Sequence, residues 1–171
     1  MRRLIGLDPG LRATGWGVIE VEGNRLSHVA NGVLKADPEG EMAVRLRQLF
    51  EGLMQVLETW SPDAAAVESV FVNKDMGSSL KLGQARGVVL LAPALRGIEV
   101  AEYAPNQIKK ALVGVGHAEK NQLRAMVGRL MPGCVIAGAD AADALGVAIC
   151  HAHSAPSPHL AAAIRRAGAR R

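Results

Sequence analysis

Residues 3–34 read RLIGLDPGLRATGWGVIEVEGNRLSHVANGVL, and this stretch decides the fold class. Residues 3–8 are a short apolar run that ends in Asp8-Pro9-Gly10, and two β-rich runs follow at residues 14–21 and 26–34. Turn-forming residues at 22–25 separate the second run from the third. The pattern predicts a three-stranded meander that begins the chain.

The rest of the chain alternates helical and strand patterns. Apolar residues recur at helical spacing over residues 42–60, 80–95 and 123–130, and the Ala-rich residues 139–151 predict a further helix. Residues 105–112 could form a short helix after Pro105. Residues 64–67 and 98–103 read as strands, and Pro93 should kink or end the second helix. The order β-β-β-α-β-α-β-α-α-α predicts an α/β fold of the RNase H-like type, with a mixed five-stranded sheet flanked by helices.

Size and composition favour one domain. The chain has 171 residues, of which 49% are hydrophobic, and its two cysteines form no metal-binding or disulfide pattern. We expect residues 1–153 to be the folded domain and residues 154–171 to be a basic, flexible C-terminal tail. No apolar run approaches the roughly 18 residues of a membrane span, and no signal-peptide core is present, so a cytoplasmic protein without membrane contact is expected.

The net charge of +4 is uninformative until its distribution is considered. Four arginines in the tail, at positions 165, 166, 170 and 171, account for the whole excess. If four carboxylates converged on metal ions, the remaining surface would be basic enough to favour a nucleic-acid partner. The charge argument therefore depends on the site.

Four acidic residues stand where a charge needs a partner. Asp8 and Glu68 each end an apolar strand, where a carboxylate is costly unless it reaches solvent or a cation. Asp140 and Asp143 are three residues apart on one helix face, where like charges repel, and Asp140 lies in the first turn. Taken singly, each could instead be a turn, cap or solvated residue. Spacing alone does not show that the four side chains meet.

An all-oxygen ligand set without His or Cys suits Mg²⁺, for which Mn²⁺ can substitute. Two such ions can activate a water and stabilise the leaving oxygen in phosphodiester hydrolysis, so metal-dependent nuclease activity is the predicted chemistry. No GxxxxGK[ST] pattern is present, so no nucleotide cofactor is expected, and Gly83 and Gly87 are interpreted as allowing close backbone packing. His117, His151 and His153 are expected at the surface or at helix ends.

Several motifs together resemble the RuvC family of crossover junction endodeoxyribonucleases. They are IGLDPG with the following TGWG, then VESVF, SSLKLGQARGV, NQIKKALVGVGHAEKNQ and ADAADALGVAICHAH. The resemblance runs in order from about Leu4 to His153. It implies an RNase H-like nuclease whose metal-binding catalytic carboxylates are Asp8, Glu68, Asp140 and Asp143. It also implies a homodimer that nicks two strands of like polarity symmetrically in a four-way DNA junction, during recombination and repair, and that works with the RuvA and RuvB branch-migration complex.

The resemblance also implies DNA contacts. Phe71 matches the aromatic residue that reaches distorted bases at the crossover, although it could also be a core residue. Lys109 and Lys120 match basic residues near the scissile phosphate, and Lys110 could assist. Lys74, Lys81 and Arg86 flank the glycine-containing helix and are further candidates for duplex-backbone contacts. For each of these lysines, an ordinary solvated side chain is the alternative.

Three other functions are alternatives to a RuvC-like junction nuclease. An actin-like or sugar-kinase-like ATPase begins with a similar hairpin but needs two such domains. This chain has no second hairpin motif of that kind, which disfavours the ATPase. A module that binds junctions without cutting them would be expected to lack a carboxylate. Another RNase H-like nuclease, acting on RNA in hybrids or on damaged DNA, has the same carboxylates, and only the family resemblance favours four-way junctions over those substrates.

Overall fold

The computed structural model describes residues 1–69, 75–114 and 120–154, with only the backbone of Lys120. Within these residues the elements follow the predicted order. The strands are β1 (Arg2–Asp8), β2 (Ala13–Glu22), β3 (Arg25–Lys35), β4 (Ala64–Glu68) and β5 (Glu99–Tyr103). The helices are α1 (Met42–Trp60), α2 (Met76–Leu95), α3 (Pro105–Val113), α4 (Lys120–Leu130) and α5 (Ala139–Ser154).

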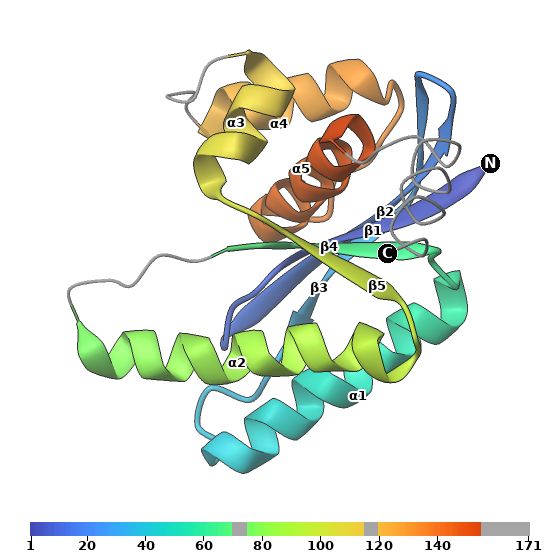
Figure 1. The fold of residues 1–171 in the computed structure, drawn as a ribbon. Helices are drawn as coiled ribbons and strands as arrows, with labels where there is room; N and C mark the ends of the chain where they lie inside the picture. The colour runs from blue at the N-terminus through green and yellow to red at the C-terminus, as the bar shows by residue number, and fades with distance from the viewer. Residues whose placement is uncertain (70–74, 115–119, 155–171) are drawn as a thin grey trace, which may run out of the picture.

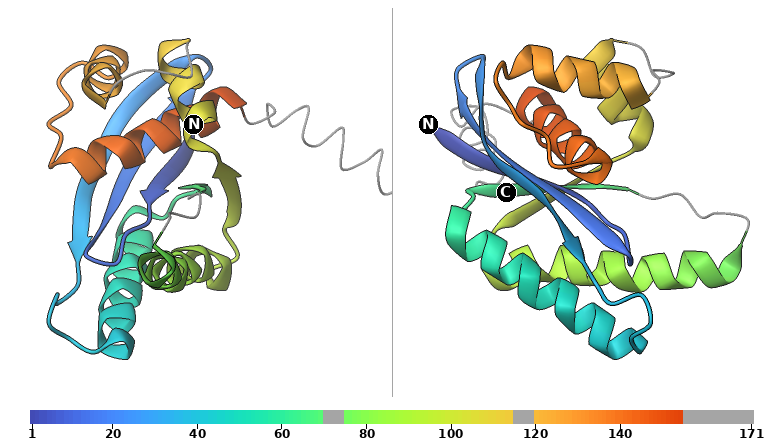
Figure 2. Two further views of the ribbon diagram at one scale, coloured as in Figure 1. Left: turned by 90° about the vertical axis from the view of Figure 1, so that its left-hand side faces the viewer. Right: turned by 180° about the vertical axis from the view of Figure 1, so that it is seen from behind.

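The five strands form one mixed sheet in the order β3-β2-β1-β4-β5. The first three pair antiparallel, as the meander predicted, while β4 pairs parallel with both β1 and β5. Helices α3, α4 and α5 cover one face of the sheet, and α1 and α2 cover the other (Figures 1 and 2). This arrangement is an RNase H-like fold.

Each face of the sheet is set by the alternation of side chains along its strands. Leu4 of β1 and Ala64 and Ala66 of β4 join the core cluster under α5. Their neighbours Ile5, Leu7, Ala65 and Val67 join the cluster under α1 and α2. Both strands are therefore buried on both faces, and an acidic residue at the end of each has a defined side of the sheet to face.

Glycines bring α5 unusually close to the sheet. A Cβ atom at Gly6 would lie 2.0 Å from the carbonyl oxygen of Ala144, and one at Gly15 would lie 2.0 Å from the carbonyl oxygen of Asp140. A Cβ at Gly17 would overlap the Leu145 side chain. The α5 backbone consequently rests on β1 and β2 where these strands have no side chains.

The packing interpretation of Gly83 and Gly87 is wrong within this chain. A Cβ at either position would meet nothing within 4 Å. The side of α2 that packs inward carries Ala85, Val89 and Ala92 instead, and these are buried. Pro93 lies in the last turn of α2, which ends two residues later, as its position predicted.

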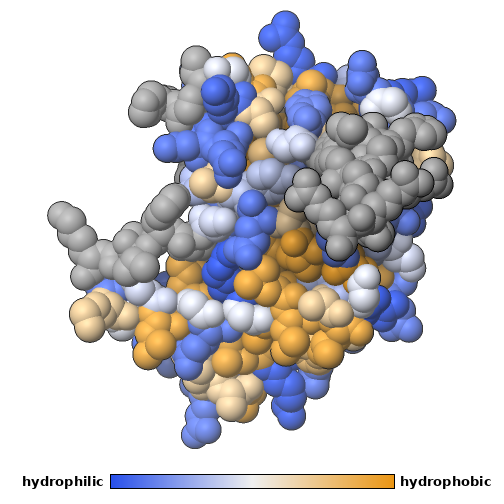
Figure 3. Space-filling view, in the orientation of Figure 1, coloured by the Kyte–Doolittle hydropathy of each residue, from blue (hydrophilic) through white to orange (hydrophobic). Residues whose placement is uncertain are grey.

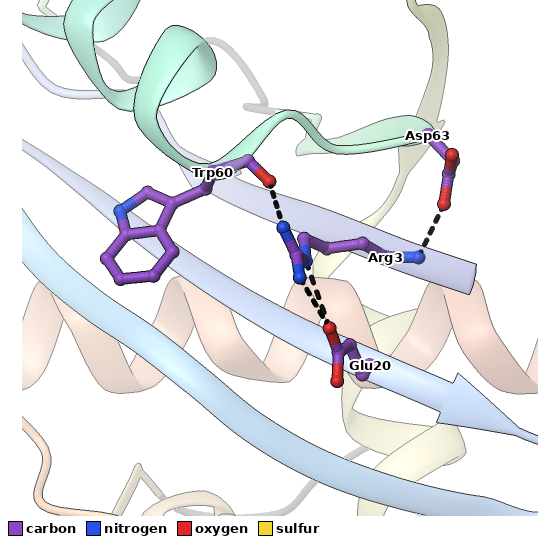
Figure 4. Close-up of polar contacts among 4 residues, drawn as sticks. All are labelled: Arg3, Glu20, Trp60 and Asp63. Carbon is purple, nitrogen blue, oxygen red and sulfur yellow. Dashed lines mark hydrogen bonds and ion pairs between the residues drawn. The ribbon is translucent and has the colours of Figure 1, made fainter. Parts of the chain in front are cut away.

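A polar network near the start of β1 joins this strand to β2, to the end of α1 and to the residue before β4 (Figure 4). The Arg3 guanidinium donates to Glu20 Oε1 at 2.6 Å and to the Trp60 carbonyl at 2.7 Å. The Arg3 backbone N–H donates to the Asp63 carboxylate at 2.7 Å, and Asp63 N–H donates to the Arg3 carbonyl. This network fixes the chain between α1 and β4, which aligns β4 beside β1.

Candidate active site

The ends of β1 and β4 lie side by side. The parallel register pairs Leu7 with Val67, so Asp8 and Glu68 are the next residues along each strand. Because both strands alternate in step, the two acidic side chains face α5 together. Sheet pairing therefore brings these two positions together, which spacing along the sequence could not show.

Helix α5 brings the second acidic pair to the same place. Asp140 lies in the first turn of α5, as predicted, and Asp143 follows one turn later. The close approach of α5 to Gly15 holds the backbone of Asp140 directly over β2, beside the end of β1. The four acidic side chains line one pocket of about 310 Å³.

The electrostatics of this pocket are unfavourable without a cation. Burial, followed by repulsion from Glu68 and Asp143 and a hydrogen bond with Glu68, raises the pKa of Asp8 from 3.8 to about 8. Asp140 acts in the same direction. An Asp8 carboxyl that resists ionisation at neutral pH marks a place where a divalent cation would relieve repulsion.

The oxygen atoms of these four carboxylates are of the kind that binds such an ion, although the side chains do not form a complete metal centre. Within residues 1–69, 75–114 and 120–154, no three acidic, His or Cys side chains are arranged as a formed metal centre. The carboxylates share the pocket, and those around Asp8 repel it, a repulsion that a divalent cation bound among them would relieve. Hard oxygen donors of this kind suit Mg²⁺.

Of the predicted basic residues that the structure describes, only Lys109 lines the pocket. Lys109 of α3 is half-buried and lines the pocket, whereas Lys110 is exposed and outside its lining. Lys81 is exposed on α2, and Lys120 begins α4. Phe71 and Lys74 lie outside the described residues. Arg86 is turned into the structure and contacts the backbone of Glu68.

The sequence patterns did not predict the structural roles of Thr14 and His151. Thr14 is buried, and its hydroxyl donates to the Gly10 carbonyl at 2.8 Å and accepts from the Gly10 N–H, which closes the loop after Asp8. His151 lies in the last turn of α5, one of the two places expected for it, but it is buried there and not at the surface. Its Nδ1 lies 2.8 Å from the Tyr103 hydroxyl. A threonine soon after Asp-Pro-Gly was the available signal for the first.

Comparison with known proteins agrees with this geometry. The family model described as crossover junction endodeoxyribonuclease RuvC matches residues 4–151. A protein of that name from Rhodospirillum rubrum is 57% identical over 166 residues, covering 97% of this chain and 98% of the relative. Another from Paracoccus denitrificans is 59% identical over 151 residues, covering 88% and 92%.

Among solved structures, T. thermophilus RuvC in complex with a Holliday junction substrate superimposes with a TM-score of 0.82 at 33% identity, covering 89% of this chain and 93% of the other. The match to the family model includes Asp8, Glu68, Asp140 and Asp143, and with them every residue that lines the acidic pocket. The chain belongs to the RuvC family of crossover junction endodeoxyribonucleases.

Proposed function

We propose that this protein resolves Holliday junctions by symmetric, metal-dependent nicking of two strands of like polarity during recombination and DNA repair. The observation that carries the proposal is the pocket in which four carboxylates from β1, β4 and α5 lie beside Lys109. A cluster of acids suits metal binding, and a lysine at its rim suits a phosphate.

Asp8, Glu68, Asp140 and Asp143 would hold two Mg²⁺ ions, for which Mn²⁺ would substitute. When bound, such ions activate a water and stabilise the leaving oxygen of a phosphodiester. Asp8 would contribute most to the demand for a cation, because it is partly buried beside three other carboxylates and its pKa is raised to about 8. Lys109 would hold the phosphate and balance its charge in the transition state.

The remaining DNA contacts are proposed by family membership. Phe71 would stack on a distorted base at the crossover, and Lys120 would act with Lys109 near the scissile phosphate. Lys110 would assist these two lysines, and Lys74 and Lys81 would contact the duplex backbone. Arg86 differs from these residues because its guanidinium already has partners within the chain.

The test is cleavage of a labelled synthetic four-way junction, beside linear duplex and an RNA–DNA hybrid, with Mg²⁺, with Mn²⁺ and with EDTA. Paired symmetric nicks on the junction alone, abolished by EDTA, are expected. Cutting of the hybrid or of linear duplex would retain the metal site but contradict the junction assignment. Cutting in EDTA would contradict the role of the carboxylates.

A homodimer is the proposed assembly, and α2 is the proposed contact. Its outer face carries Leu80, Gly83, Gly87, Leu91 and Leu95 at helical spacing. The three leucines are 67%, 52% and 62% exposed. Figure 3 shows hydrophobic residues gathered over the region where α2 lies. The two glycines would let a second copy approach the helix backbone closely, and a two-fold dimer would match the symmetry of the junction.

Light scattering after size-exclusion chromatography tests this assembly. Leu91→Lys is expected to shift the protein from dimer to monomer, whereas Val135→Lys, which changes an exposed valine outside α2, should leave the dimer intact. A monomeric wild type, or a Leu91→Lys variant that remains dimeric, would contradict the α2 contact.

We further propose that the protein acts in the cytoplasm with the RuvA and RuvB branch-migration complex. Within the part of the chain that the structure describes, no helix has the length and apolarity needed to cross a membrane. Stimulation of junction cleavage by added RuvA and RuvB would support the partnership, and unchanged cleavage under branch-migrating conditions would oppose it.

A further inference from the structure

The side chain of Arg86, on α2, contacts the backbone of Glu68, one of the four predicted catalytic carboxylates. Its Nη1 donates to the Glu68 carbonyl oxygen at 2.5 Å, and its Nη2 forms an ion pair with Glu102 Oε2. Only 17% of the Arg86 side chain is exposed. Two of its guanidinium nitrogens are therefore occupied inside the molecule.

Arg86 lies on the face of the sheet opposite the acidic pocket. Along β5, Val100 packs into the cluster under α1 and α2, while Tyr103 packs into the cluster under α5. Glu102, which alternates with Tyr103, consequently faces α2 and meets Arg86 there. Arg86 is absent from the pocket lining, so its contact is with the backbone of Glu68 while the Glu68 carboxylate is on the other side.

The pairing of β4 with β1 ends one residue before Glu68, at Leu7 and Val67, whereas the pairing of β4 with β5 includes Glu68, which lies opposite Tyr103. On the other side, Ser69 N–H donates to the Tyr103 carbonyl at 2.7 Å, which continues the pairing with β5. Arg86 supplies a contact for the Glu68 carbonyl. The end of β4 is thus held by β5 and by α2.

We propose that Arg86 is a positioning residue that holds the Glu68 backbone so that its carboxylate remains in the metal-binding cluster. Glu102 orients the guanidinium, because an arginine fork can bind a carboxylate and a carbonyl at the same time in a fixed plane. The inference rests on the proposed function of the pocket and concerns one residue's part in it.

Three variants test this role: Arg86→Met removes both contacts, Arg86→Lys retains one charged donor, and Glu102→Gln retains an acceptor without its charge. Arg47→Met is the matched control, because Arg47 also pairs with a glutamate, Glu51, but on the exposed surface of α1. Each variant is first checked for an unchanged circular dichroism spectrum and for melting above the assay temperature.

The first measurement is Mn²⁺ affinity by isothermal titration calorimetry, which does not require cleavage. The second is the single-turnover cleavage rate at saturating junction, beside the junction Kd in EDTA at several salt concentrations. Arg86→Met is expected to weaken Mn²⁺ binding and lower the cleavage rate, each by roughly 10- to 100-fold, with junction Kd unchanged. Arg86→Lys should recover part of both losses, and Glu102→Gln should show a smaller loss.

Two outcomes would overturn the inference. If Arg86→Met binds junctions more weakly with a shallower salt dependence, while its Mn²⁺ affinity and saturated rate match the wild type, Arg86 is a DNA contact. If only its melting temperature falls, Arg86 is merely structural. Failure of the wild type to cut junctions would instead count against the proposed function, and the Mn²⁺ titration would still decide the role of Arg86.

Discussion

Asp8 is the acidic residue whose ionisation the folded site disfavours most clearly. It is partly buried and has three other carboxylates around it, and its pKa is raised to about 8 as a result. The folded chain tolerates this arrangement although an ionised carboxylate would be more stable in water. Such a cost is expected where residues are arranged for function.

Asp8→Asn is expected to abolish junction cleavage, with a loss of at least about 1000-fold, while junction binding persists or tightens. The amide removes a metal ligand and also a negative charge close to the DNA phosphates. Single-turnover cleavage with Mg²⁺ and a binding titration in EDTA measure the two effects separately. Loss of binding together with cleavage would contradict the role of Asp8 as a metal ligand.

The raised pKa of Asp8 also predicts how stability depends on pH. The unfolded chain releases this proton near pH 3.8 and the folded chain near pH 8, so the free energy of unfolding should fall as pH rises between these values. Asp8→Asn lacks this titration. In the absence of metal, its melting temperature should match the wild type near pH 4 and exceed it by at least about 3 °C at pH 8.5.

Thermal melts in EDTA across this pH range provide the measurement, and added Mg²⁺ should narrow the difference by stabilising only the wild type. A constant difference between the two proteins at all pH values would show that Asp8 is not the titrating group.

At the scale of elements, the distance between α5 and the sheet determines whether the two acidic pairs meet. Gly15 lies on β2 beside Asp8, in register, and its missing side chain leaves room for the Asp140 backbone. Any side chain at position 15 would move the start of α5. The site therefore depends on a glycine that carries no chemistry of its own.

Gly15→Ala is expected to lower the cleavage rate at least about 10-fold and to destabilise the fold by about 1 to 3 kcal/mol, because the new Cβ would overlap the Asp140 carbonyl. Gly128→Ala is the control, since Gly128 lies in α4 with nothing within 4 Å of its added Cβ. Cleavage assays and thermal melts compare the two variants. Wild-type cleavage by Gly15→Ala would show that α5 can shift without consequence.

At the scale of the whole molecule, α5, which ends at Ser154, is the last element in the part of the chain that the structure describes. The family model ends slightly earlier, at residue 151. A protein truncated after Ser154 is therefore expected to fold with a melting temperature within about 2 °C of the full chain, as differential scanning calorimetry would measure. A larger loss would mean that the final residues contribute to the core.

The sequence by itself determined the order of the elements, because the strand and helix periodicities are local properties of the chain. It also placed Asp8 and Glu68 at strand ends and Asp140 and Asp143 on one helix face. Boundaries shifted by a few residues: α5 continues to Ser154, and α2 begins at Met76 although its stripe was marked from Leu80. These are ends, where periodicity is weakest.

Only the tertiary structure decided which of these positions meet. Local patterns do not state that β1 lies between β2 and β4, and this order makes Asp8 and Glu68 neighbours. The inward course of Arg86 and the burial of His151 depend on residues distant in the sequence, Glu102 and Tyr103. Periodicity indicates which face of an element is apolar, but the partner of a polar side chain follows from packing between elements, which is a property of the folded chain.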